Sequence, residues 1–188
     1  MKKKGSLASA LKKYSEMNAS VRVGVLESAT YPDGTPVAMV AFWNEYGALA
    51  NIPAHTRKIY RSINEKTGGF KKGGKFTKAS KSNFETTVQI PAHTIVIPAR
   101  AFFRTTVSDQ KKNWVLSVQN LMKMHDDPKK VMGLIGEHMR GQIVQSINTW
   151  TDPPNAPYTV RMKGFNKPLV DQGIMMRSIS FEVGELSE

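Results

Sequence analysis

Two long amphipathic segments, separated by one helix-breaking site, constrain the fold of this chain more than any other feature. From Phe102 to about Met124, apolar side chains recur at helical spacing, and they are Val107, Trp114, Val118, Leu121 and Met122. A second segment runs to about Thr149, and its apolar positions are Val131, Leu134, Ile135, Met139, Ile143 and Ile147. Between the two, Asp127 is suited to cap a helix and Pro128 to stand in its first turn. The pattern predicts a helical hairpin with a buried apolar seam.

Shorter segments near the two ends of the chain predict strands. Apolar side chains alternate with other residues over 21–26, and the same alternation returns over 179–183. With the helical hairpin between them, these strands predict the α+β class. We expect a mostly antiparallel sheet packed against the pair of longer helices.

A third helix is predicted over Val37–Tyr46. The turn residues of Tyr31–Gly34 come before it, Thr35 is expected to cap it, and Pro36 is expected at its first position. Gly47 is expected to end it.

Two shorter helices complete the expected helical content. One runs from its cap at Ser6 to about Met17, and the other from its cap at Asp171 to Arg177. The proline-rich segment 152–157 is incompatible with a helix or an inner strand, so an extended crossing into 158–160 is expected.

Most of the net charge of +12 lies in one stretch between Arg57 and Lys81. Nine basic residues against the single acid Glu65 give this stretch +8, and they are Arg57, Lys58, Arg61, Lys66, Lys71, Lys72, Lys75, Lys78 and Lys81. Two glycine pairs, at 68–69 and 73–74, break any helix or long strand. An exposed loop or a long hairpin is therefore expected, with Phe70 and Phe76 on two strands folded about the second pair.

A near-repeat flanks the basic stretch. Residues 51–56 read Asn-Ile-Pro-Ala-His-Thr and residues 89–94 read Gln-Ile-Pro-Ala-His-Thr. The prolines favour extended edge segments that form the base of the arm. The equivalent positions of His55 and His93 predict an equivalent hydrogen-bonding role rather than catalysis. We therefore expect a single α+β domain over 1–188 with a basic arm inserted at 52–96.

Three interpretations of the basic arm stay open at this point. It could be a solvated surface arm with two anchoring aromatic residues. It could follow a nucleic-acid backbone, since basic residues interleaved with phenylalanine suit phosphates and bases. It could also dock on an acidic protein, because charge of this kind bears on association rather than on fold.

The sequence contains no recognisable catalytic, cofactor or metal constellation. The chain has no cysteine, which excludes disulfides, a cysteine nucleophile and thiolate metal sites. None of the four histidines has a partner at helical spacing, and no phosphate-binding loop occurs. Asp171-Gln172-Gly173 superficially resembles the Asp-Thr-Gly of aspartic proteases, but such an enzyme needs two carboxylates at one site. No catalytic residue, cofactor or metal is therefore predicted.

No membrane association is predicted either. No stretch approaches the roughly 18 consecutive apolar residues of a membrane span. The basic start, Met-Lys-Lys-Lys, is not followed by the apolar segment of a secretory signal. A soluble protein made in the cytosol is expected.

Six short motifs occur in an order that resembles the neck and tail-completion proteins of long-tailed bacteriophages. The motifs span nearly the whole chain, and they are 21–25, 29–38, Asn44–Gly47, Ile97–Arg104, 153–157 and 167–173. Two features depart from the family pattern. The segment 48–96 separates two blocks that lie close together in many relatives, and Gln172 stands where threonine is common.

The resemblance implies an α+β virion protein without catalytic activity, located where the tail tube meets the head connector. It implies a ring of copies with the sixfold symmetry of the tail. The implied partners are the head-closure or stopper protein, the tail terminator and the tail tube, with contact to packaged DNA through the arm. The implied location is the virion, with host cytoplasm during assembly. A nucleic-acid-binding module that uses the basic arm is the alternative; a hydrolase has no supporting constellation.

Motif positions and charges together suggest the interface residues. Asn44, Glu45 and Tyr46 match the family's helix end, and Glu45 is expected to be exposed there and to form an ion pair within the chain or across an interface. Phe102 and Phe103 are expected to anchor the core. The forked donors of two arginines are expected to meet carboxylates on a neighbour. The predicted interface set is Glu45, Arg57, Lys58, Arg61, Lys71, Lys72, Lys75, Lys78, Arg100 and Arg104.

Overall fold

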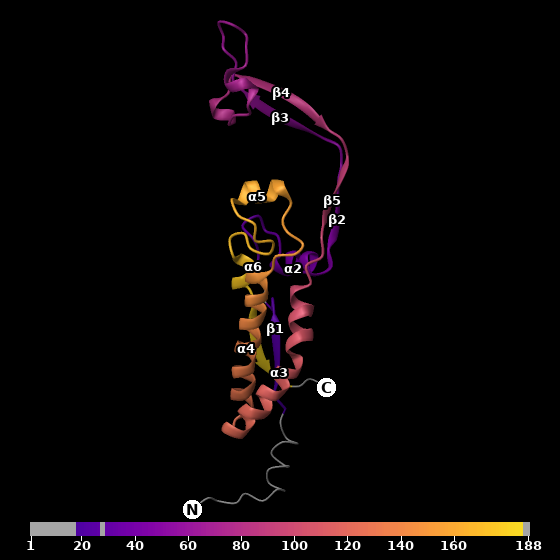
Figure 1. The fold of residues 1–188 in the computed structure, drawn as a ribbon, viewed down its shortest axis with the longest axis vertical. Coiled ribbons are helices and arrows are strands. Elements are labelled where there is room, and N and C mark those ends of the chain that lie inside the picture. The colour runs from indigo at the N-terminus through magenta and orange to yellow at the C-terminus, as the bar shows by residue number, and fades with distance from the viewer. Residues whose placement is uncertain (1–17, 27–28, 186–188) are drawn as a thin grey trace, which may run out of the picture. The chain divides into compact units, whose positions relative to one another are not determined.

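The structure is a computed structural model that describes residues 18–26 and 29–185. The chain divides into two compact units. Unit 1 combines the chain up to Ala48 with the chain from Pro98 onward, and unit 2 is Leu49–Ile97. The helix expected over Ser6–Met17 lies outside the described residues. The α+β class is as predicted, with helices and antiparallel strand pairs (Figure 1).

The two long helices of unit 1 form where the sequence predicts them. Helix α3 spans Phe102–Met124, and helix α4 spans Pro128–Thr149. They pack against each other and run side by side in Figure 1. The Asp127 carboxylate accepts a hydrogen bond from the Lys129 N–H at 2.9 Å, so the predicted cap of α4 is confirmed.

The buried face of α4 follows the i, i+4 positions of the pattern. Val131, Ile135, Ile143 and Ile147 are buried, whereas Leu134 is 43% exposed. The prediction for Leu134 was therefore wrong. Leu134 directly precedes Ile135 in the helix, which turns its side chain about 100° away from the buried row.

A two-stranded antiparallel sheet lies against α4. Strand β1 (Ser20–Gly24) pairs with strand β6 (Ser180–Gly184), with Val21 opposite Val183. The approach is close at Gly136 of α4, where a Cβ atom would stand 2.5 Å from the ring of Phe181. The described strands form three separate pairs, β1–β6, β2–β5 and β3–β4, rather than one continuous sheet.

The core of unit 1 gathers side chains from both ends of the sequence. Helices α2 (Val37–Tyr46) and α6 (Ile174–Arg177) join α3 and α4 around it. Its buried members are Val37, Phe102, Ile143, Ile147, Leu169, Met175 and Ile179. Phe103 packs against this cluster while remaining partly exposed, so the two phenylalanines serve as the predicted anchors.

Helix α2 has its predicted bounds but a different cap. Pro36, in extended conformation, is the N-cap residue, and no side chain caps the helix. Thr35 instead belongs to the preceding turn, where its N–H donates to Asp33 Oδ1 at 3.0 Å and its carbonyl accepts from Tyr31 N–H at 2.8 Å. Gly47, with φ of 77°, ends the helix as predicted.

The C-terminal part of unit 1 departs from prediction at two points. A helix, α5 (Pro157–Lys163), stands where an extended crossing is expected. Pro157 is tolerated because it occupies the first turn, where its missing N–H has no helical partner. Helix α6 has Gly173, with φ of 72°, as its N-cap, so Asp171 is not the cap.

Unit 2 is a long hairpin of four strands in two consecutive pairs. Strand β2 (Ala48–Ile52) pairs with β5 (His93–Ile97), and β3 (His55–Arg61) pairs with β4 (Phe84–Ile90). The second pair is antiparallel, from His55 opposite Ile90 to Arg61 opposite Phe84. The proline segments of the near-repeat interrupt both sides of the hairpin between the two pairs.

The two repeat histidines have the predicted equivalent role. The Nδ1 atoms of His55 and His93 each lie 3.1 Å from the carbonyl oxygen two residues earlier, of Pro53 and Pro91 respectively. Since a carbonyl only accepts, each imidazole donates, and each ring closes its own turn.

The end of the hairpin is a structured loop rather than a pair of strands. The strands stop at Arg61 and Phe84, and short 3-10 turns at Lys71–Gly74 and Ala79–Lys81 follow within the loop. Phe70 and Phe76 therefore do not lie on paired strands around the glycine pair, which corrects the expectation. Phe70 instead bridges to Ile63, and Lys71–Gly74 form a 3-10 turn, so no strand pair encloses the glycine pair.

None of the helices in the described part of the chain is long and apolar enough to cross a bilayer.

Candidate functional site

A buried carboxylate links helix α2 to the start of helix α3. Glu45, in the last turn of α2, is only 5% exposed. Its carboxylate accepts hydrogen bonds from the N–H groups of Phe103 at 2.9 Å and Arg104 at 3.0 Å. The first N–H groups of a helix have no partner within it, and Ala101, the N-cap of α3, has no side chain to supply one. Glu45 therefore caps α3 from another helix.

Arg104 completes the contact with Glu45. Its Nε atom donates to Glu45 Oε1 at 2.9 Å, and its Nη2 atom donates to the Glu45 carbonyl at 2.9 Å. The guanidinium also lies 4.4 Å from the centre of the Tyr46 ring, within the range of a cation–π interaction. Arg104 thus holds the end of α2 through an acid, a carbonyl and an aromatic ring.

The expectation of an exposed Glu45 is wrong, although its ion pair exists and lies within the chain. The physical reason is the helix end that it faces. The unpaired N–H groups and the dipole at a helix N-terminus favour a carboxylate, and they compensate its removal from water.

Arg100 is buried and uses its forked donors inside the chain. Its Nε and Nη2 atoms donate to the carbonyls of Pro153 at 3.0 Å and Pro154 at 3.1 Å, and its Nη1 atom donates to Asn44 Oδ1 at 3.1 Å. Burial lowers the pKa of the Arg100 guanidinium. The prediction that Arg100 meets a carboxylate on a neighbour is therefore wrong, because all three of these nitrogens are engaged within unit 1.

We call this set of five residues the junction: Asn44, Glu45, Tyr46, Arg100 and Arg104. It joins two motif blocks that lie more than 50 residues apart in sequence, and the backbone N–H of Arg100 donates to the carbonyl of Asn44. Its donors and acceptors are matched to one another, so it positions helices rather than reacting groups. No cluster of three or more potential metal ligands occurs among the described residues.

The basic residues of unit 2 have different surroundings. Lys58 forms an ion pair with Glu85 at 2.8 Å on the neighbouring strand. The Arg61 guanidinium lies between two aromatic rings, 5.2 Å from the centre of Phe70 and 5.2 Å from that of Phe76. Neither residue is therefore a free surface charge.

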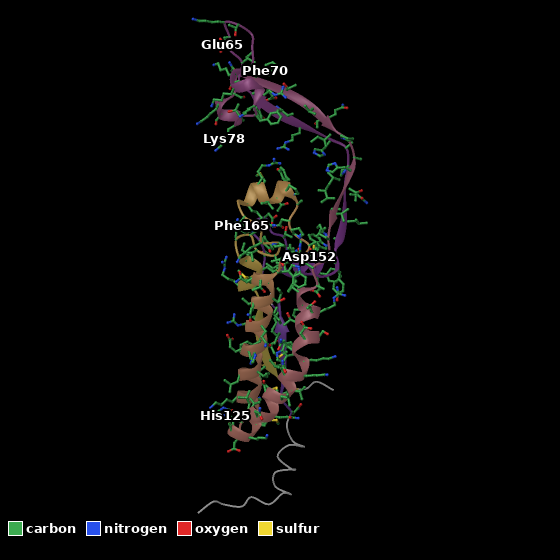
Figure 2. All side chains as sticks on the ribbon, in the orientation of Figure 1. Glu65, Phe70, Lys78, His125, Asp152 and Phe165 are labelled. Atoms are coloured by element: carbon green, nitrogen blue, oxygen red, sulfur yellow. The ribbon has the colours of Figure 1, made fainter. Side chains whose placement is uncertain are left out.

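The other basic residues of the hairpin are exposed and lack an acidic partner in the described part of the chain. Figure 2 shows Glu65, Phe70 and Lys78 at the end of the hairpin that lies beyond β3 and β4. The exposed, unpaired cations are Arg57, Lys66, Lys71, Lys72, Lys75, Lys78 and Lys81. The structure thus separates the predicted arm residues into two that are used internally and a larger group that faces solvent.

Exposed apolar side chains mark further surface that the sequence analysis missed. On α2, Met39, Phe42 and Tyr46 stand at helical spacing and are 46%, 60% and 53% exposed. The rings of Phe42 and Tyr46 lie 4.8 Å apart, so they form one continuous aromatic surface. The spacing of these residues was visible in the sequence, but burial of the opposite face, at Val37, decides which face is free.

Comparisons with models of protein families, with curated proteins and with solved structures found no significant match to this chain.

Proposed function

We propose that this chain is a structural virion protein of the bacteriophage neck or tail-completion type. In this proposal it assembles into a ring that joins the tail tube to the head connector. Its partners are copies of itself, the head-closure or stopper protein, the tail terminator and the tail tube. It is made in the host cytoplasm and ends in the virion, and it catalyses no reaction.

The junction carries this proposal. Two of the six motif blocks that together carry the family resemblance converge there, and Glu45, Arg100 and Arg104 use their polar atoms to hold α2, α3 and the proline-rich segment together. In a structural protein, we expect the motif residues to hold helices together. The same residues would leave an enzyme without a free acid, base or nucleophile at that place.

The exposed face of α2 supports assembly through protein contacts. A row of three large apolar side chains is more than the scattered exposure that is usual on a protein surface. A ring requires a heterologous interface, in which this face would meet a different surface of the next copy. Aromatic residues and methionine are enriched at such interfaces.

Unit 2 supports the same conclusion independently. Not one residue of Leu49–Ile97, all of which the structure describes, is buried. A two-stranded hairpin without a covered face is marginally stable in water. An adjoining protein or a nucleic acid would supply the missing contacts. A protein located between head and tail has such partners next to it.

Native mass spectrometry of the full chain tests the ring, and electron microscopy of purified phage particles tests the location. We expect a closed oligomer. Phe42→Asp should weaken the association of its copies by at least about tenfold, because loss of the aromatic contact costs roughly 1.4 kcal/mol or more. Gln119→Asp adds the same charge at an exposed polar position of α3 and serves as the control. A chain that stays monomeric with its connector partners, and that is absent from virions, would contradict the proposal.

A further inference from the structure

We propose that the end of the hairpin binds the phosphodiester backbone of a nucleic acid without regard to sequence. We call the segment Ser62–Asn83 the hairpin tip. This inference does not depend on the ring, because it concerns one element of one copy, and it adds a partner class to the proposed structural role.

The charge of the hairpin tip is of one sign. Six lysines face a single acid, Glu65, which leaves the 22 residues with +5. The Glu65 carboxylate accepts a hydrogen bond from Asn83 Nδ2 at 3.3 Å and pairs with none of the lysines. The six exposed lysines are Lys66, Lys71, Lys72, Lys75, Lys78 and Lys81. Such a group repels itself in the free protein and is stabilised when an anionic polymer neutralises it.

Internal hydrogen bonds hold the lysines on an ordered scaffold. Asn83 closes the base of the tip, since its Oδ1 accepts from the Ile63 N–H at 2.8 Å and its Nδ2 donates to the Ile63 carbonyl at 2.9 Å. Ser62 adds two hydrogen bonds. Its hydroxyl donates to the Lys81 carbonyl at 3.0 Å, and the Ser62 carbonyl accepts from the Lys71 N–H at 2.7 Å. Ordering before binding reduces the conformational entropy lost when the lysines meet a ligand.

Arg61 acts as a positioning residue for the tip. It lies between Phe70 and Phe76, and its Nε atom is buried without a hydrogen-bond partner. A buried, unpartnered donor is costly, so the contacts with the two rings must hold the side chain there. Phe76 remains 68% exposed, which leaves ring surface available for stacking with a base.

The exposed ring of Phe76 among the lysines favours a nucleic acid over an acidic protein as the ligand, because a ring can stack on a base. Every free cation of the tip is a lysine, a compact point charge with a flexible stem, which suits the spaced phosphates of a nucleic acid.

A second copy of the chain lacks the complementary charge. In the described part of unit 1, 13 basic and 10 acidic residues give +3, so that surface carries no excess of acid. The tip is therefore better matched to a polyanion than to its own kind.

Fluorescence anisotropy with the full chain tests the inference, using labelled DNA duplexes of two unrelated sequences, a single strand of equal length and a salt titration. The variant Lys71→Gln/Lys72→Gln/Lys75→Gln/Lys78→Gln removes four tip charges. Loss of four phosphate contacts makes the negative slope of log affinity against log salt shallower by about 3–4. Affinity near 0.1 M salt should fall by about a hundredfold or more. The control Lys111→Gln/Lys112→Gln/Lys123→Gln/Lys130→Gln removes the same charge from exposed helical positions and should bind as the unmodified protein does.

Arg61→Lys separates positioning from direct contact. It keeps the charge but lacks the planar guanidinium that contacts both rings, so affinity should fall several-fold while the salt slope stays unchanged, and protease cleavage within the tip should accelerate. Unchanged affinity and cleavage would show that Arg61 does not position the tip.

Wild-type affinity and salt slope in the tip variant would overturn the inference. So would polyglutamate that competes as strongly as DNA of equal charge, since the partner class would then be an acidic protein. Tighter binding to the single strand, lost in Phe76→Ala, would support contact that includes base stacking; tighter binding to the duplex would support contact through phosphates alone. Ring formation by the tip variant, measured in parallel, keeps this result distinct from a failure of the proposed assembly.

Discussion

Unit 1 and unit 2 stabilise their structures in different ways. Unit 1 buries a cluster of apolar side chains from α2, α3, α4 and the C-terminal segments, and it uses the junction to satisfy polar groups inside. Unit 2 buries no residue and depends on strand pairing and local hydrogen bonds. Unit 1 is therefore stabilised by its buried interior, whereas unit 2 leaves its side chains at the surface, where a partner can contact them.

Removal of a buried aromatic side chain from unit 1 should change stability the most, whereas removal of an exposed one from unit 2 should change it little. Phe102 is 2% exposed, so Phe102→Ala leaves a cavity and should lower the free energy of unfolding of unit 1 by about 3–5 kcal/mol. Phe76→Ala in the hairpin tip should change that same free energy by less than about 0.5 kcal/mol. Urea denaturation followed by tryptophan fluorescence measures both, because Trp43, Trp114 and Trp150 all lie in unit 1.

Equal destabilisation by the two phenylalanine variants would contradict this difference between the units. It would mean that unit 2 folds as part of the same cooperative core as unit 1.

The second prediction concerns carboxylates. Glu45→Ala leaves the N–H groups of Phe103 and Arg104 without their acceptor, and we expect a loss of about 2–4 kcal/mol in thermal denaturation. Glu45→Gln keeps one acceptor oxygen and should lose less. Glu85→Ala removes only the exposed ion pair with Lys58 and should have an effect below about 1 kcal/mol.

A Glu45→Ala protein as stable as the unmodified one would show that water can replace the carboxylate. The junction would then not be the structural link described above.

Two glycines of α4 differ in how closely other side chains pack around them. At Gly136 an added Cβ would meet Phe181 at 2.5 Å and Val21 at 2.8 Å, so Gly136→Ala should destabilise unit 1 by about 1–3 kcal/mol. Gly141 has open space around it, and Gly141→Ala should stabilise by roughly 0.5–1 kcal/mol through helix propensity. Opposite shifts in melting temperature are expected, and a gain from both substitutions would contradict the close packing of α4 on the β1–β6 pair.

The stability of each unit should depend weakly on pH through one ion pair. Hydrogen bonding to Arg140 lowers the pKa of Glu137, so this pair stabilises unit 1 above the ordinary carboxyl range and loses that contribution as the pH falls through the folded pKa. Glu85 raises the pKa of Lys58 in unit 2, so that contribution is present below the ordinary lysine pKa and is lost only at higher pH.

Melting curves of the unmodified protein and of Glu137→Gln, recorded from neutral to acid pH, test this difference. The two curves should converge at acid pH, whereas Glu85→Gln should leave the acid limb of unit 1 unchanged. An acid limb that is identical with and without Glu137 would remove this carboxylate as its source.

Local sequence was sufficient to predict the elements for which the apolar period, the capping residue and the helix-breaking residues all indicate the same structure. The long helices α3 and α4 have an uninterrupted apolar period and, between them, a cap with a proline in the next position, so their bounds could be predicted closely. Prediction failed where the deciding contact is distant or where two local rules compete. Helix α5 begins at a proline after a proline-rich segment, and Leu134 lies just outside the buried row.

The features of the candidate site also fall into those that local sequence predicts and those that depend on distant contacts. The charge and the glycines of 57–81 predicted an exposed hairpin, because repulsion and backbone freedom act locally. The burial of Glu45 and Arg100 could not be predicted, since each is compensated by groups more than 50 residues away, the N–H groups of α3 and the carbonyls of Pro153 and Pro154. The cation–π contacts of Arg61 likewise depend on where the loop carries Phe70 and Phe76.

The amino-acid sequence was enough to predict the α+β class, the helical hairpin and the basic character of the inserted segment, and it contains no recognisable catalytic motif. Which charged residues are internal and which are free for a partner depends on long-range contacts that exist only in the folded chain. The physical reason is desolvation: a charge can leave water only where other parts of the chain supply matching donors and acceptors, and those parts meet only when the whole chain has folded.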